Sequence, residues 1–291
     1  MFLLDTAEKL LALVFFVSTM LSIGMQTRVT DLRLLLASRR FLLRTLLANF
    51  LIVPVCGVVL ALLLPLPPHI KGALVLLACT PGGPSSVQFT GQVRQSAPLA
   101  GAQLGLLSFT AVFLSPLILK LLLPGDVQWA IPYGNALLAL LVFLILPILA
   151  GMFLLATVPD AASKLSKLLV LIGVIAFIAF MVVTGDARKA AAGEVGALAV
   201  AAMLLFIFIS MTVGWFLGGP TVEFRRIMAA STSMRNAALC LAIVESSSPG
   251  HAVIVPLVAF SLLMVPTNML FSVYHTVRDR RKEKEALRSV K

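Results

Sequence analysis

One short window of the sequence combines a basic side chain with several hydrogen-bonding side chains in otherwise apolar surroundings. Residues 229–239 contain three hydroxyl side chains, an arginine and an amide, among them Ser231, Ser233, Arg235 and Asn236. Arg235 follows Arg226 by nine residues, which corresponds to about 13 Å along a helix. An ionised side chain at that depth of a membrane is costly and usually serves a function. A guanidinium carries a permanent charge and five donors, so it suits a carboxylate or a sulfate.

Two other interpretations of these polar residues remain open. Arg235 could snorkel to the membrane surface or form a structural ion pair, although no Asp or Glu lies at a comparable depth in the predicted spans. Asn236 could form a hydrogen bond between helices, which is common in membranes, instead of binding a solute.

A second window should interrupt a helix. Residues 79–88 read Cys-Thr-Pro-Gly-Gly-Pro-Ser-Ser-Val-Gln, with two prolines flanking Gly82 and Gly83. Proline removes a backbone donor and clashes with the preceding turn, and glycine permits non-helical angles. A simple proline kink is the alternative. Backbone groups exposed by a break inside a membrane must be satisfied by protein or water, so the break should line a cavity.

The two breaks together predict an anion-binding site. Broken helices at matching places in two halves of a chain are typical of transporters built from inverted repeats, whose site lies at the midplane. The half-helices that follow Pro84 and Arg235 would present free amides and positive dipole ends. We therefore predict that the substrate contacts a set of residues from both windows: Arg235, Asn236, Ser85, Ser86, Gly83 and Ser233.

The rest of the chain predicts the helices that position this site. It has 291 residues, of which 60% are apolar and 12% charged, and a mean hydropathy of +1.05. This composition indicates an all-α polytopic membrane protein and excludes a cytosolic enzyme. Windows of about 20 apolar residues predict nine transmembrane helices, near residues 9–27, 41–64, 70–91, 98–123, 129–155, 165–184, 190–217, 225–245 and 251–275.

The basic residues predict the orientation. Seventeen of the 23 Lys and Arg fall on one set of alternate joints and five on the other. Since basic residues are retained on the cytoplasmic side, we expect a cytoplasmic C-terminus and an N-terminus outside. The net charge of +11 then reflects topology, not a nucleic-acid partner. We interpret residues 1–277 as one membrane unit and 278–291 as a basic cytoplasmic tail that contacts the lipid bilayer.

Several sequence motifs resemble the bile acid:sodium symporter family. The run from Cys79 to Gly83 is similar to its C-x-P-G-G helix break, and Met234-Arg235-Asn236 resembles the end of its E-x-G-x-Q-N motif. The resemblance implies a panel domain and a core domain in which the broken helices cross. Residues 70–123 and 190–245 would belong to the core and the remaining spans would be panel-like. It also implies a bacterial-type transporter in the cytoplasmic (inner) membrane.

The chain departs from this family at the positions where the resemblance implies sodium ligands. A Ser-Asn pair of the family reads Ser86-Val87 here, its glutamate corresponds to Ser231, one glutamine to Arg235 and another to Asn49. The ion-binding positions that remain are Asn49, Ser86 and Ser231. Valine cannot coordinate a cation, whereas the Arg235 guanidinium supplies a fixed positive charge about where sodium would sit.

These features predict a secondary transporter of a small organic anion that works by alternating access and is not coupled to sodium in the family's usual way. The alternatives are a sodium-dependent symporter with rebuilt ion sites and a non-transporting sensor or channel of the same fold. An enzyme is not expected, because no Ser/His/Asp set or metal cluster lies at one depth. No cofactor and no bound metal are predicted, and the sequence does not predict an oligomeric state.

Overall fold

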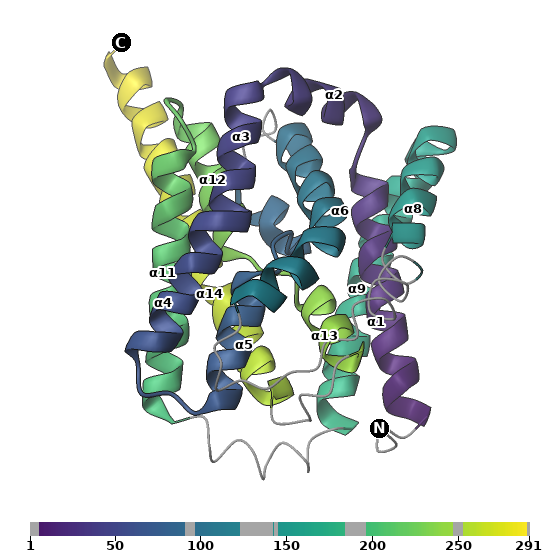
Figure 1. The fold of residues 1–291 in the computed structure, drawn as a ribbon. Coiled ribbons are helices and arrows are strands. Elements are labelled where there is room, and N and C mark those ends of the chain that lie inside the picture. The colour runs from purple at the N-terminus through teal and green to yellow at the C-terminus, as the bar shows by residue number, and fades with distance from the viewer. Residues whose placement is uncertain are drawn as a thin grey trace.

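The computed structural model describes residues 6–90, 97–122, 142, 145–183, 196–246 and 253–289. These residues form a bundle of helices (Figure 1), with the following bounds: α1 (Thr6–Gln26), α2 (Val29–Ala37), α3 (Arg39–Leu47), η1 (Ala48–Ile52), α4 (Val53–Leu63), α5 (Pro68–Ala78), η2 (Pro84–Thr90), α6 (Ala97–Leu122), α8 (Leu146–Thr157), α9 (Pro159–Val183), α11 (Ala197–Leu217), α12 (Val222–Ser233), α13 (Ala237–Ser246) and α14 (Ile254–Ser289).

Five helical segments among the described residues are long and apolar enough to cross a membrane. They correspond to five of the nine predicted spans: Arg39–Leu63, Leu99–Leu122, Pro159–Ala179, Ala197–Leu217 and Ile254–Asp279. The predicted spans at 70–91 and 225–245 are interrupted, and residues 129–141 lie outside the described part of the chain. The all-helical, multi-pass architecture agrees with the sequence, and the count of nine spans and the inverted repeats stay predictions.

Apolar side chains point outward along the membrane helices. In the second predicted span, Leu51, Val55, Val59 and Leu62 are exposed and recur every three or four residues. This spacing places them on one helix face. An exposed stripe of this kind is unfavourable in water and favourable in lipid, so it is the expected surface of a membrane-embedded helix.

The helices divide into two groups by their contacts. Helix α1 packs closely on α8 and α9, at one side of the bundle in Figure 1. Gly24 and Gly151 permit this approach, because a Cβ on either residue would clash with backbone atoms of the other helix. Helices α4 and α14 contact α5 and α11, and the division of the spans into a panel and a core domain stays a prediction. The hydropathy pattern predicts that a helix is buried in the membrane but not which neighbours it has.

The basic regions lie at one end of the bundle. Figure 1 places α2, α3 and the C-terminus at the same end, and the N-terminus at the opposite end. Residues 28–40, predicted as a polar joint, contain the short helix α2. The predicted tail at 278–291 does not begin with a break, because α14 continues as one helix to Ser289.

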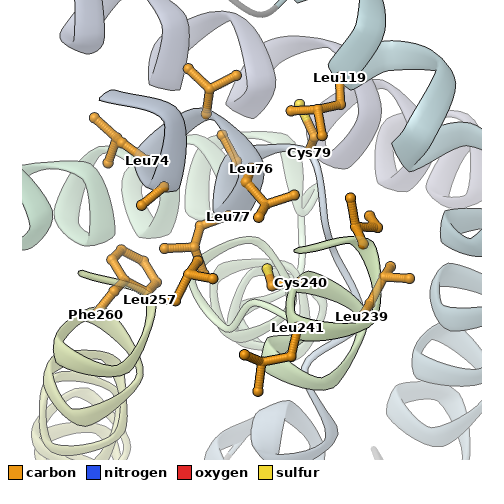
Figure 2. Close-up of a cluster of buried hydrophobic side chains, with 14 of the residues drawn as sticks. Leu74, Leu76, Leu77, Cys79, Leu119, Leu239, Cys240, Leu241, Leu257 and Phe260 are labelled. Atoms are coloured by element: carbon orange, nitrogen blue, oxygen red, sulfur yellow. The ribbon is translucent and has the colours of Figure 1, made fainter. Parts of the chain in front are cut away.

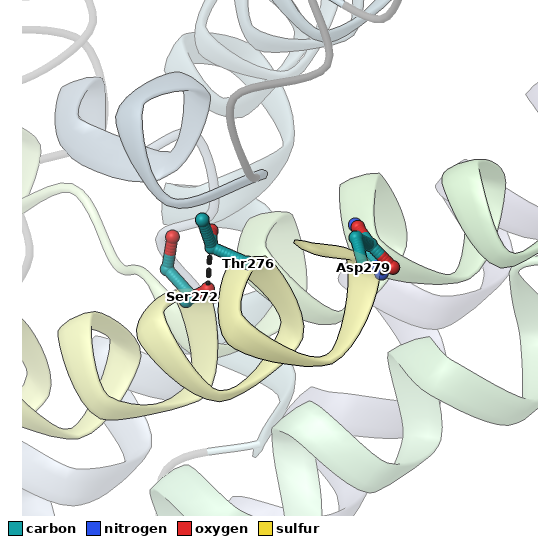
Figure 3. Close-up of polar contacts among 4 residues, drawn as sticks. Ser272, Thr276 and Asp279 are labelled. Carbon is teal, nitrogen blue, oxygen red and sulfur yellow. Dashed lines mark hydrogen bonds and ion pairs between the residues drawn. The ribbon is translucent and has the colours of Figure 1, made fainter. Parts of the chain in front are cut away.

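An ion pair fixes α14 to α12 near the basic end. The guanidinium of Arg226 donates two hydrogen bonds to the carboxylate of Asp279, at 2.6 and 2.8 Å. Arg226 is 5% exposed, so this bidentate pair is largely shielded from water on the arginine side. Figure 3 shows Asp279 on α14, close to Thr276, whose hydroxyl donates to the Ser272 carbonyl at 2.9 Å.

Candidate functional site

The first predicted break is present between α5 and η2. Helix α5 ends at Ala78, and Cys79 and Thr80 close its last turn with backbone bonds to Val75, Leu76 and Leu77. Gly82 then adopts a φ of 89°, a left-handed conformation that glycine adopts without strain. The segment after Pro84 is not the α-helix expected from the sequence. It is a seven-residue 3-10 helix, whose first turn is closed by the Ser86 amide donating to the Gly83 carbonyl at 3.0 Å.

The second predicted break separates α12 from α13. Met234 has extended angles, φ −89° and ψ 118°, which end α12 after Ser233. Asn236 then caps α13, because its side-chain oxygen accepts a hydrogen bond from the Leu239 amide at 3.0 Å. Asparagine is among the preferred residues at this position, since it satisfies a first-turn amide that has no partner within the helix.

The two breaks meet. Pro81 and Arg235 form an isolated antiparallel bridge, and the Asn236 amide donates to the Thr80 carbonyl at 2.9 Å. Gly83 is required for this approach, because a Cβ there would lie 2.7 Å from the carbonyl oxygen of Arg235. Backbone groups that each helix leaves unpaired are thus satisfied by the other segment, which accounts for two helix breaks inside an apolar bundle.

The core below this crossing is tightly packed. Figure 2 shows Cys79 and Cys240 among buried leucines of α5 and α13. The Thr80 hydroxyl contacts the sulfur of Cys240 at 2.8 Å, which adds a side-chain contact to the backbone bridge. The crossing is therefore held by both the backbone and the surrounding side chains.

A cavity of about 150 Å³ adjoins the crossing. Met234, Arg235, Asn236 and Ala237 from the second break line it, together with side chains of α1, α9 and α14. The lining from those three helices is mostly apolar: Phe15, Thr19, Ser22, Val170, Val174, Phe177, Ser261, Met264 and Val265. The cavity lies between α1 and α9 on one side and the second break and α14 on the other.

The polar end of this cavity is rich in donors. Arg235 is 0% exposed, and its Nε, Nη1 and Nη2 have no hydrogen-bond partner among the described residues. The same holds for Nδ2 of Asn236, since the oxygen of that amide is engaged as the helix cap. A buried donor without an acceptor costs free energy, and a buried unpaired charge costs more. A ligand that supplies anionic oxygens would satisfy all of these groups together.

The other predicted substrate residues have different surroundings. The Ser233 hydroxyl donates to Oδ1 of Asn268 on α14 at 2.6 Å and is not in the cavity lining, so its contact with a substrate stays a prediction. Gly83 lets the backbone of the first break lie close to the backbone of Met234 and Arg235. Ser86 is 4% exposed and also lies outside the lining. The side chain of Ser85 is outside the described part of the structure.

Two of the predicted ion-binding residues, Ser231 and Asn49, form hydrogen bonds within their own helices. The Ser231 hydroxyl donates to the Met228 carbonyl at 3.0 Å. Asn49 lies in the π-helical turn η1, donates to the Thr45 carbonyl at 3.1 Å, and keeps its buried oxygen without a partner among the described residues. A hard cation needs several oxygens. Among the described residues, no group of three or more His, Cys, Asp and Glu could hold a metal ion.

Sequence reasoning did not identify three hydroxyl residues of the lining. They are Thr19 and Ser22 on α1 and Ser261 on α14. On α1, Thr19, Ser22 and Gln26 recur every three or four residues and so share one helix face. This spacing does not show which neighbouring helices the face meets. Only the packing of α1, α9 and α14 around the second break brings these residues together.

Comparison with known proteins shows the family of this chain. A family model described as "Sodium Bile acid symporter family" matches residues 12–191. The chain belongs to the sodium bile acid symporter family. The match includes the first break, from Cys79 to Pro84, and ends before the second break at Arg235. The resemblance seen in the sequence motifs is thereby confirmed.

Two plant proteins are similar to part of this family member. Both are described as "Probable sodium/metabolite cotransporter BASS1, chloroplastic". The protein of Arabidopsis thaliana is 31% identical over 136 residues, 47% of this chain and 33% of its own length. The protein of Oryza sativa subsp. japonica is 32% identical over 100 residues, 34% of this chain and 25% of its own length. The chain therefore matches a third or less of each relative. The names of both relatives describe transporters, as the sequence predicted, and not enzymes.

Proposed function

We propose that the protein is a secondary transporter of small organic anions, with Arg235 as the residue that binds the anionic group. The observation that carries this proposal is the buried guanidinium of Arg235, which lines the cavity and has no partner among the described residues. Nδ2 of Asn236 is a second free donor beside it. A carboxylate can accept two parallel hydrogen bonds from a guanidinium, so a carboxylate or a sulfate is the proposed ligand group.

The size and lining of the cavity favour a compact substrate. A cavity of about 150 Å³ is comparable to one that holds a benzene molecule. Phe15 and Phe177 contribute a pair of rings with centroids 5.0 Å apart, and Val170, Val174 and Met264 complete an apolar wall. The proposed substrate is therefore an anion with a small apolar body, and alternating access would come from movement between the two helix groups.

A binding panel tests this proposal. The purified protein would be titrated with pyruvate, benzoylformate and taurocholate, which share an anionic group and differ in the size of the apolar body. We expect benzoylformate, with one phenyl ring, to bind tighter than taurocholate, whose steroid exceeds the cavity. Absence of binding by all three compounds would contradict the proposed anion site.

Independence from sodium is the second part of the proposal. The Arg235 guanidinium would replace a dissociable cation with a covalently attached one, and Ser231 and Val87 replace two of the oxygen-bearing side chains implied by the family resemblance. The same titration in sodium and in choline, at fixed ionic strength, measures how far substrate binding depends on sodium. We expect the two affinities to differ by less than tenfold, which is about 1.4 kcal/mol.

A sodium-coupled symporter is the second candidate. It is supported by the names of both relatives, which describe sodium/metabolite cotransporters. It is also supported by the buried oxygen of Asn49, which has no partner among the described residues. In such a symporter, the side-chain oxygen of Asn49 and neighbouring backbone carbonyls would form a sodium site. A sodium-specific gain in affinity of tenfold or more, lost on Asn49→Ala, would favour it over the sodium-independent transporter.

The proposed location is the cytoplasmic membrane of a bacterium, with the N-terminus outside and the C-terminus inside. It is supported by the position of the basic segments α2, α3 and the end of α14 at one end of the bundle (Figure 1), since basic residues are retained in the cytoplasm. The partners proposed are the organic anion and the lipid bilayer.

A further inference from the structure

Among the residues that the structure describes, no carboxylate is paired with the positive charge of Arg235. Among the described residues, the titratable groups that interact electrostatically with Arg235 are the thiols of Cys79 and Cys240. Neither is a carboxylate, and none of the described residues that line the cavity is acidic. The carboxylate of Asp279, which could neutralise an arginine, is paired with Arg226. Neutralisation of Arg235 therefore depends on a ligand.

A tethered cation differs from a dissociable one in the return step of a transport cycle. A carrier that binds its substrate together with a free cation releases both, and returns without a net charge in its site. Arg235 cannot leave. If the carrier closed around Arg235 alone, a guanidinium with three unpaired nitrogens would be enclosed away from water, which is strongly unfavourable. Closure with a monovalent anion on the guanidinium encloses a neutral pair.

We propose that the protein is an obligatory anion exchanger, in which Arg235 carries one anion in each direction. This inference rests on the proposed function and adds its mode of transport. The exchanged species share one chemistry, that of a monovalent anion which fits against the Arg235 guanidinium and Nδ2 of Asn236. A second molecule of the organic anion and inorganic chloride are its two possible sources. Exchange of one such anion for another moves no net charge.

Uptake into proteoliposomes with different lumenal anions tests this proposal. The purified full chain would be reconstituted in vesicles that contain benzoylformate, potassium chloride or the potassium salt of an impermeant polymeric anion. Labelled benzoylformate is added outside, and valinomycin with balanced potassium holds the membrane potential at zero. Electrical back-pressure then cannot limit net uptake, so any requirement for a lumenal anion reflects the protein.

We expect initial uptake to be at least tenfold faster with lumenal benzoylformate or chloride than with the polymeric anion. Acceleration by chloride identifies an inorganic exchange partner, and acceleration by benzoylformate alone identifies an organic one. A ratio below tenfold in both comparisons overturns the exchanger and leaves a carrier that returns empty. Absence of protein-dependent uptake in every lumen overturns the proposed carrier, and the exchange mode with it.

A variant that adds a carboxylate near Arg235 tests the same proposal. Cys79 is buried and lies two residues before Pro81, which forms the bridge with Arg235, so Cys79→Asp would place a fixed negative charge near the guanidinium. The matched control is Cys79→Asn, which has the same shape and no charge. We expect the aspartate variant to bring the ratio of exchange to net uptake near one, while the asparagine variant keeps the ratio of the unmodified protein. Equal ratios in two folded variants would contradict the role of charge.

Discussion

Replacement of Arg235 by alanine and by lysine separates the charge of this residue from its geometry. The guanidinium is 0% exposed and its three nitrogens have no acceptor among the described residues, so a bound carboxylate would form a fully buried pair with it. Arg235→Ala removes that pair. Arg235→Lys keeps a positive charge but cannot donate two parallel hydrogen bonds from one planar group.

The burial of the pair sets the expected magnitude. Loss of one partner of a buried, hydrogen-bonded charge pair costs about 2–5 kcal/mol. At about 1.4 kcal/mol per tenfold, Arg235→Ala should weaken benzoylformate binding by roughly thirtyfold to four thousandfold. Arg235→Lys should lose one charged hydrogen bond, worth about 1.5–3 kcal/mol, and weaken binding roughly ten- to hundredfold.

Thermal unfolding in detergent, with and without benzoylformate, measures binding and stability together. The matched control is Ser261→Ala, because Ser261 lines the cavity but its hydroxyl already donates to the Leu257 carbonyl at 2.8 Å. This control should change the affinity by about twofold or less. Since Arg235→Ala removes an unpaired buried charge, the ligand-free variant should be at least as stable as the unmodified protein.

Two results would refute this reasoning. Unchanged affinity in a folded Arg235→Ala variant would show that the anion binds elsewhere. Strong destabilisation of that variant without ligand would show that Arg235 has a structural partner and is not a free binding group.

Three further predictions concern the frame around the site. Gly83→Ala should destabilise the protein by about 1–3 kcal/mol, because its Cβ would meet the carbonyl of Arg235; a melting temperature equal to that of the unmodified protein would contradict the close crossing. Asp279→Ala should cost about 1–3 kcal/mol by leaving Arg226 unpaired, and adding Arg226→Met should recover part of it, as thermal unfolding of the double variant would show. Reporter fusions should place the C-terminus in the cytoplasm and the N-terminus outside, and an outside signal from the C-terminus would overturn this orientation.

The sequence predicted the helix breaks because their causes are local. Two prolines around Gly82 and Gly83 disrupt a helix whatever surrounds them, and an ionised Arg235 in an apolar run needs a protein or aqueous environment. The contact between the breaks followed from the family resemblance and is confirmed by the bridge between Pro81 and Arg235.

The remaining features of the site depend on packing and could not be predicted. The sequence shows that Ser233 is polar, but not that its hydroxyl donates to Asn268 on α14. The cap formed by Asn236 depends on where α13 begins, which the sequence fixes only to within a few residues. The π-helical turn that contains Asn49 lies just before Pro54, which lacks a backbone donor. The proline indicates an irregular helix at this place, but not that the irregularity is a π-helical turn.

The contacts between α12 and α14 restrict how this molecule can move. Three residues of α14 contact α12 or Arg235. The sulfur of Met264 accepts from the Arg235 backbone amide at 3.4 Å, Asn268 accepts from Ser233, and Asp279 pairs with Arg226. Successive residues of a helix point about 100° apart, so a rotation of α14 by a single residue would break all three contacts. Sliding along α12 would also separate the ion pair at one end and the hydroxyl contact near the other. The two helices therefore have few independent degrees of freedom and should travel as one rigid body, leaving α1 and α9 as the wall that shifts relative to Arg235.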